Sequence, residues 1–158
     1  MIKKIKSSLS ERILFIFLIS LAVLTFGSFY MIKNKCLFVK QLDLDEIIIN
    51  DPQNLAIMDV ECGKVVIELY PQISPKSVKR FKYFVNSGLY NNSTFYRVIE
   101  NTLVQAGDLE FGYHDNINYF KVGSGESKLG KLKSELSNDY EFKTGTVAMA
   151  RGEFDTED

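Results

Sequence analysis

The chain has 158 residues, of which 46% are hydrophobic and 25% are charged, so it is expected to form one globular domain with extensions at its ends. Its net charge of −1 conceals an asymmetry: residues 1–36 carry six basic side chains and one acidic one, whereas the rest carries 13 basic and 19 acidic ones. A domain with a net charge of −6 and no basic stripe argues against nucleic-acid binding.

Cysteine and histidine are too sparse to predict a metal or redox centre. Cys36 and Cys62 lie in no ligand spacing, and the single histidine, His114, stands in a polar stretch without a partner. We therefore expect no metal site. A disulfide between the two cysteines is possible outside the cytoplasm, but the sequence favours two unpaired thiols.

Residues 13–32 form an uncharged, apolar stretch. A helix of about 20 residues crosses a hydrocarbon core of roughly 30 Å. The stretch ends in large residues without an A-x-A site, which favours a retained transmembrane anchor over a cleaved signal. A buried core helix is the weaker alternative, because a helix that is apolar all round needs a large protein to cover it. Lys and Arg are slightly denser in the flank 1–12, which favours a cytoplasmic N-terminus and an exported domain.

After the anchor, residues 33–54 look like a tether that leads into a domain spanning residues 55–158. Two short apolar runs, 55–60 and 64–70, predict a hairpin in which Gly63 adopts a positive φ. Residues 74–88 predict an amphipathic helix of about four turns. Ser74 suits its N-cap, Pro75 its first position and Gly88 its end. Its apolar face is formed by Val78, Phe81 and Val85.

A second hairpin is predicted from "STFYRVI" and "LVQAGD", which begin at Ser93 and Leu103. Residues 109–143 are polar and glycine-rich and should be mainly loop, and residues 145–151 should form another strand. Because strands dominate, the expected class is mainly β, an antiparallel barrel or sandwich with a helical cap.

Arg97 stands at an unexpected place within the second hairpin. In a strand, Phe95, Arg97 and Ile99 share one face, while Tyr96 and Val98 share the other. The guanidinium group would then lie between two large apolar side chains. An edge arginine whose stem covers its neighbours is the structural alternative to a functional arginine.

Several blocks in this order resemble the cyclophilin-type peptidyl-prolyl cis-trans isomerases, and their spacing is similar to the bacterial branch. They are "GKVVIELYPQISPKSVKRFKYFVNSGLYNNSTFYRVI", "VQAGD", "SKLGKLKSELSN" and "GTVAMAR". The resemblance implies a cyclophilin-like antiparallel β-barrel of eight strands capped by two helices, with no cofactor. It also implies that the C-terminal part of the domain is missing, so that the barrel is incomplete here.

The resemblance implies that Arg97 is the main catalytic residue and that Gln105 lies beside it. The register of the hairpin bears on this pairing. A two-residue turn would place Arg97 and Gln105 on opposite faces, whereas a three-residue loop pairs Ile99 with Leu103 and therefore Arg97 with Gln105. We expect the three-residue loop, which puts both polar side chains on one face.

The resemblance also implies a peptide-binding groove lined by Thr102, Leu103, Ala150 and Arg151. Thr102 replaces the usual phenylalanine and makes the proline pocket more polar, and Leu103 is an acceptable replacement for methionine. Tyr96 replaces the histidine that usually precedes the arginine. Simple strand packing is the structural alternative for Ala150.

The expected chemistry is rotation about the Xaa-Pro bond, whose barrier is about 18–20 kcal/mol. A fixed hydrogen-bond donor near the prolyl nitrogen stabilises the twisted amide, and no nucleophile, acid or metal is needed. We expect an isomerase in the bacterial inner membrane whose domain faces the periplasm or cell exterior and acts on exported, proline-containing polypeptides. The alternatives are a module that binds such segments without turning them over, motivated by Thr102 and the missing pocket, and a structural remnant.

Overall fold

The computed structural model describes residues 8–40, 42–48, 51–151 and 156–157. The chain divides into two compact units, the first formed by residues 1–48 and 58–65 and the second by residues 49–57 and 66–158. Most of the predicted basic flank, residues 1–7, lies outside the described residues.

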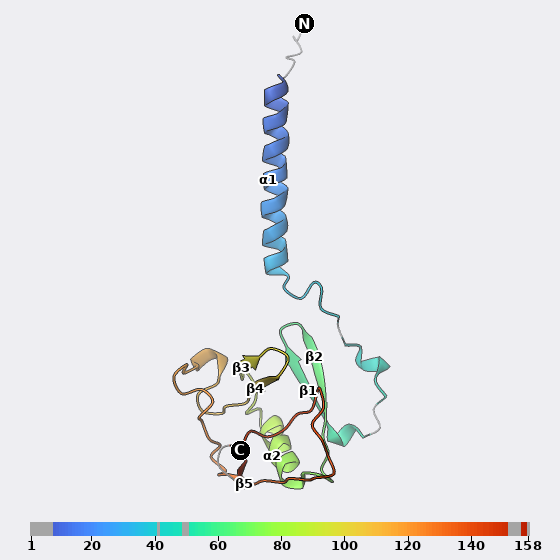
Figure 1. The fold of residues 1–158 in the computed structure, drawn as a ribbon, viewed down its shortest axis with the longest axis vertical. Coiled ribbons are helices and arrows are strands. Elements are labelled where there is room, and N and C mark those ends of the chain that lie inside the picture. Colours follow the sequence, from blue (N-terminus) through green and yellow to red (C-terminus); the bar gives the residue numbers. More distant parts are fainter. Residues whose placement is uncertain (1–7, 41, 49–50, 152–155, 158) are drawn as a thin grey trace. The chain divides into compact units, whose positions relative to one another are not determined.

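The first unit contains one long helix, α1 (Leu9–Lys33), drawn in blue in Figure 1. A capping box begins it at Ser8: the Ser8 hydroxyl accepts from the Glu11 N–H at 3.3 Å, and the Glu11 carboxylate accepts from the Ser8 N–H at 2.8 Å. This box extends the helix beyond the predicted span of 13–32. The helix is long and apolar enough to cross a membrane, and its side chains are exposed along its length.

A disulfide joins Cys36 to Cys62 in this unit, with the two Cα atoms 5.0 Å apart, so the prediction of two unpaired thiols is wrong. The cysteines are 26 positions apart in the sequence and meet because a turn follows α1 and Cys62 lies in the turn of the first hairpin. The neighbouring Lys35 ammonium group pairs with the Glu61 carboxylate at 3.1 Å. Sequence spacing alone does not reveal such a meeting.

The first hairpin forms as predicted, from β1 (Leu55–Val60) and β2 (Gly63–Glu68). Gly63 begins β2 with a φ of +146°, a value that favours glycine. The predicted tether that precedes the hairpin contains two short 3₁₀ turns, η1 (Leu44–Glu46) and η2 (Pro52–Asn54).

The predicted amphipathic helix is α2 (Pro75–Asn86) in the second unit. Its end is a Schellman motif: Gly88 has a φ of +68°, its N–H donates to the Val85 carbonyl, and the Leu89 N–H donates to the Phe84 carbonyl. Ser74 occupies the N-cap position with Pro75 next, but the Ser74 side chain makes no capping hydrogen bond.

The side chain that caps α2 is Glu135, which lies in the mainly irregular region 109–143, far from α2 in the sequence. Its carboxylate accepts from the backbone N–H groups of Lys76 and Ser77 and from the Ser77 hydroxyl, at 2.9–3.0 Å. Arg80 also donates to the carbonyl of Gly130 in the same loop. The loop therefore holds the helix at its N-terminal end.

The buried hydrophobic side chains of the second unit, among the described residues, lie on α2. Phe84 is only 3% exposed and Val78 only 8% exposed, and the rings of Phe84 and Tyr90 pack edge to face at 5.5 Å. Phe84 is missing from the predicted apolar face, whereas Val85, which that face includes, is 38% exposed.

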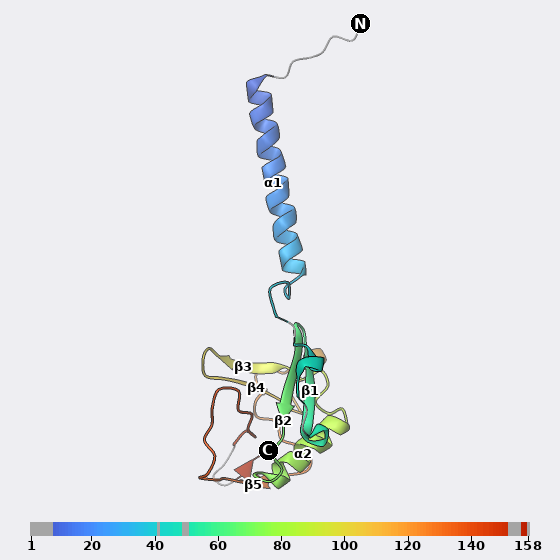
Figure 2. The same cartoon turned by 90° about the vertical axis from the view of Figure 1, so that its right-hand side faces the viewer.

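The second hairpin consists of β3 (Phe95–Ile99) and β4 (Leu103–Ala106). Figure 2 shows the chain after β4 running mainly as loop, as predicted, with the short turn η3 (His114–Asn116). A last short pair joins β5 (Leu132–Lys133) to β6 (Thr156–Glu157). The described strands thus form three separate two-stranded sheets, and the predicted barrel is not closed.

The strand predicted over residues 145–151 is wrong. Residues 146–150 belong to no strand, and Arg151 makes an isolated bridge. A strand requires a partner, and the alternating apolar pattern finds none among the described residues. Val147 is consequently 64% exposed.

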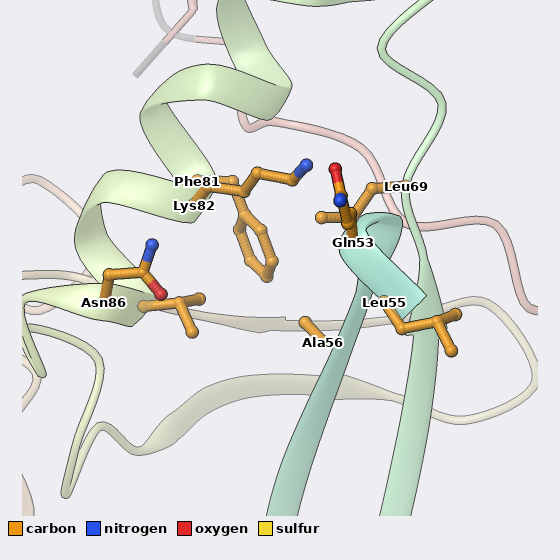
Figure 3. Close-up of a pocket in the computed structure, with 8 residues that line it drawn as sticks. Gln53, Leu55, Ala56, Leu69, Phe81, Lys82 and Asn86 are labelled. Carbon is orange, nitrogen blue, oxygen red and sulfur yellow. The ribbon is translucent and has the colours of Figure 1, made fainter. Parts of the chain in front are cut away.

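The space between α2 and β1 is a cavity of about 90 Å³ in the second unit. Figure 3 shows Phe81 projecting from α2 toward Leu55 and Ala56 of β1, with Lys82 and Gln53 at the rim. The Lys82 ammonium group donates to the Asn54 side chain at 2.6 Å. Phe81 is therefore less enclosed than Phe84.

Candidate functional site

The pairing of β3 with β4 brings the two predicted catalytic residues together. The strands are antiparallel, with Ile99 opposite Leu103 and Arg97 opposite Gln105, so the prediction of a three-residue loop is confirmed. Within that loop Asn101 has a φ of +55°. The Arg97 guanidinium group donates from Nη1 to Gln105 Oε1 at 3.5 Å.

The register shifts between Phe95 and Arg97, because Phe95 pairs with Ala106 and Arg97 with Gln105. Tyr96 is therefore an extra residue in β3, as in a β-bulge. The predicted strict alternation of the two faces fails at this point. Arg97, the residue after the bulge, is the one that pairs with Gln105 across the strands.

Tyr96 is half-buried, and its surroundings change its acidity. Burial and the negative charge of Asp108 raise the pKa of Tyr96, while the positive charge of Arg97 and the nearby polar side chain of Gln105 oppose this rise. The hydroxyl group is therefore protonated at neutral pH. In the sequence Tyr96 is notable only as a replacement for histidine, because a bulge depends on two strands together and leaves no local signal.

Arg97 is exposed on the hairpin. Among the residues that the structure describes, no carboxylate forms an ion pair with it. Its long hydrogen bond to Gln105 engages one nitrogen, so guanidinium N–H groups remain that can donate to a carbonyl or amide of a bound peptide.

The carboxylate of Asp108 fixes the loop that follows β4. This side chain is buried, with only 6% of the residue exposed. One carboxylate oxygen accepts from the N–H groups of Glu110 and Phe111 at 2.9 and 2.8 Å, and the other from those of Gly123 and Gly125 at 2.7 and 3.1 Å. Burial opposes the charged form, but these four bonds outweigh it and lower the pKa of Asp108.

The glycines around this carboxylate make room for it. A Cβ atom added to Gly125 would lie 2.2 Å from Asp108 Oδ1, and one added to Gly112 would lie 2.9 Å from the Asp108 carbonyl oxygen. Gly123 has a φ of +93°, and a Cβ there would lie 3.0 Å from the Tyr96 ring. The loop that Asp108 holds therefore lies against the Tyr96 ring.

The four predicted groove residues lie in two places. Thr102 ends the β3–β4 loop, where its hydroxyl donates to the Glu100 carbonyl at 3.2 Å, and Leu103 begins β4 on the same face as Gln105. Ala150 lies exposed in the unpaired segment and Arg151 at the isolated bridge. The structure therefore places Thr102 and Leu103 next to the arginine strand, but it forms no strand at Ala150 that would supply a groove wall.

Metal-binding side chains do not gather at this hairpin. Across the described ranges, no group of three or more His, Cys, Asp or Glu side chains is placed to hold a metal ion. The chemistry that this arrangement supports is hydrogen-bond donation from Arg97, which Gln105 orients.

Known proteins are similar to part of this chain. A "Probable peptidyl-prolyl cis-trans isomerase" of Brucella suis biovar 1 is 39% identical over 104 residues, which are 65% of this chain and 53% of the relative. A "Peptidyl-prolyl cis-trans isomerase" of Acinetobacter baylyi is 34% identical, over 60% of this chain and 45% of the relative. "Peptidyl-prolyl cis-trans isomerase B" of Escherichia coli is 32% identical, over 56% and 48%.

The chain thus spans about half the length of these curated relatives. No solved structure matches it. The family model described as "Cyclophilin type peptidyl-prolyl cis-trans isomerase/CLD" matches residues 55–158, about two thirds of the chain, and this family implies a β-rich fold. The chain therefore belongs to the cyclophilin-type peptidyl-prolyl cis-trans isomerase family.

Proposed function

We propose that this chain is a peptidyl-prolyl cis-trans isomerase in which Arg97 donates to the twisted prolyl amide. The observation that carries the proposal is the cross-strand pair of Arg97 and Gln105 on one face of the β3–β4 hairpin. Rotation about the amide bond makes and breaks no covalent bond, so a preorganised donor is sufficient chemistry. Thr102, Leu103, Ala150 and Arg151 are proposed to contact the peptide.

We further propose that α1 anchors the protein in the bacterial inner membrane and that the domain acts on exported proline-containing polypeptides in the periplasm or at the cell exterior. The length and composition of α1 support a membrane span. The disulfide between Cys36 and Cys62 supports an oxidising compartment for the domain, since disulfides are rare in the cytosol.

The catalytic proposal is tested with the full chain in detergent micelles and a short Xaa-Pro peptide whose cis–trans exchange is followed by NMR. Arg97→Ala should slow catalysed exchange about a hundredfold, the usual effect of removing one transition-state donor. Lys79→Ala, which removes an exposed positive charge from α2, is the matched control and should leave exchange unchanged. Retention of most of the activity by Arg97→Ala would refute the assignment.

A non-catalytic binding module is the second candidate, favoured by Thr102, which would make the proposed proline pocket more polar, and by the open barrel. Peptide binding without faster exchange between its cis and trans forms would identify such a module. Thr102→Phe adds apolar surface to the pocket and should raise peptide affinity or turnover, because a buried aromatic ring contributes large apolar area. If neither the wild type nor Thr102→Phe binds the peptide, the domain is a structural remnant.

The anchor is tested by fractionating cells that express the full chain. The protein should remain with membranes after alkaline carbonate extraction and dissolve only in detergent. Recovery of the full-mass chain in the soluble fraction would show that α1 does not anchor it.

A further inference from the structure

The end of α1 coincides with the edge of the hydrocarbon core if the helix spans a membrane. The uncharged residues 13–32 rise about 30 Å at about 1.5 Å per residue, which matches a core of roughly 30 Å. Lys33 is the last residue of the helix. The residues that follow it therefore leave the hydrocarbon at the level of the lipid headgroups.

Residues 34–39, which we call the juxtamembrane turn, stay close to this end of the helix. The Leu37 N–H donates to the Asn34 carbonyl at 3.1 Å. The Val39 N–H donates to the Cys36 carbonyl, also at 3.1 Å, and the Cys36 sulfur is tied to the turn of the first hairpin by the disulfide. Hydrogen bonds and a covalent bond thus fix the shape of this turn.

The juxtamembrane turn exposes consecutive apolar side chains. Phe38 is 80% exposed, and Leu37 and Val39 on either side of it are exposed as well. Connecting segments in water are normally polar, and a run of exposed apolar residues in one indicates a function. At the boundary between headgroups and acyl chains such side chains are buried without any protein partner.

A cavity of about 400 Å³ lies at the same turn. It is lined by Lys33, Asn34, Lys35, Cys36, Leu37 and Glu61. The Lys35 ammonium group is neutralised by the Glu61 carboxylate at 3.1 Å, whereas Lys33 forms no ion pair within the part of the chain that the structure describes. The cavity therefore carries one uncompensated positive charge, which the phosphate of an anionic lipid complements.

We propose that the juxtamembrane turn is a lipid-binding site, in which Phe38 and its neighbours enter the headgroup boundary and Lys33 binds the phosphate of an anionic phospholipid. The proposal rests on the proposed anchoring by α1 and adds a second contact with the bilayer. Because the disulfide joins this turn to the β1–β2 turn, the same contact holds the β1–β2 turn at the membrane surface.

Insertion of the turn is tested by fluorescence. The sequence contains no tryptophan, so a single replacement creates a unique reporter. The full chain is reconstituted into vesicles whose acyl chains carry bromine near the headgroup, which quenches tryptophan on contact. Phe38→Trp should be quenched to the same extent as Phe29→Trp, which reports on α1 itself. Phe120→Trp, at a fully exposed phenylalanine of the second unit, is the matched control and should not be quenched.

The reference variant separates the site from the anchor. Quenching of Phe29→Trp without quenching of Phe38→Trp would overturn the lipid site and leave the anchor standing. Absence of quenching from both variants would reject the anchor and the lipid site together.

The charge is tested in the Phe38→Trp chain by comparing brominated phosphatidylglycerol with brominated phosphatidylcholine at equal mole fraction. One lysine near the surface should favour the anionic lipid about fivefold. Lys33→Gln should remove this preference, and Lys79→Gln, which changes an exposed lysine of α2, should keep it. Sodium phosphate should weaken the preference no more than sodium chloride of equal ionic strength. An unchanged preference in Lys33→Gln, or specific competition by free phosphate, would overturn the assignment of Lys33 to a lipid headgroup.

Discussion

Replacing Asp108 by asparagine tests how much the loop after β4 depends on one buried carboxylate. Asparagine keeps the shape of the side chain but presents one acceptor and one donor end, whereas the four surrounding N–H groups all require acceptors. Two of the four bonds are therefore lost, and an NH₂ group faces two N–H groups. At about 1.5–3 kcal/mol for each bond to a charged group, the expected cost is about 3–6 kcal/mol.

The assay is amide hydrogen exchange of the full chain, followed at Gly123 and Gly125. A loss of about 3 kcal/mol corresponds to exchange that is roughly a hundredfold faster. Asp115→Asn, which neutralises an exposed carboxylate seven positions further on, is the matched control and should leave these amides unchanged. Equal exchange in wild type and Asp108→Asn would show that the carboxylate does not hold the loop.

The same variant has a defined dependence on pH. Because the folded pKa of Asp108 lies below its unfolded value of about 3.9, this carboxylate stabilises the protein above that value. Its contribution is lost as the pH falls through the folded pKa. The difference in unfolding free energy between wild type and Asp108→Asn should therefore shrink on acidification below about pH 4, and a constant difference would contradict this reasoning.

Other changes test separate parts of the structure. Glu135→Ala removes the cap of α2 and should cost about 1–2 kcal/mol in denaturant unfolding; because the pKa of Glu135 is lowered, this difference should also shrink below about pH 4. Replacing Cys36 and Cys62 by serine opens a ring with a sequence separation of 26 and should lower the free energy of unfolding by about 3.5 kcal/mol, which reduction of the wild type should reproduce. Gly123→Ala should lower the melting temperature more than Gly130→Ala. Both glycines have a positive φ, but only at Gly123 would the added Cβ atom lie within 4 Å of another side chain.

The hairpins and the helix could be predicted because their signals are local. Alternating apolar residues, Gly63 in the first turn and Gly88 after α2 act within a few positions of the chain. The register of Arg97 with Gln105 followed from loop length alone. These features depend on neighbours in sequence, and so a sequence reports them well.

The features that the sequence did not reveal depend on distant partners. Glu135 caps a helix that begins 60 positions earlier, and Cys36 meets a turn 26 positions later. The bulge at Tyr96 is a property of two strands together, and it interrupts the alternation of faces in β3. Residues 145–151 show the converse, since a good strand pattern forms no strand without a partner.

The disulfide changes the length of chain that separates α1 from the domain. Along the backbone, the 21 residues from 34 to 54 lie between the helix and β1. Through the sulfur atoms, the path from Lys33 reaches the β1–β2 turn by way of Asn34, Lys35 and Cys36 alone. The segment from 37 to 54 therefore lies in a covalent ring that the disulfide closes. An insertion in this segment does not lengthen the connection through the sulfur atoms, and a single proteolytic cut there leaves helix and domain covalently joined until the bridge is reduced.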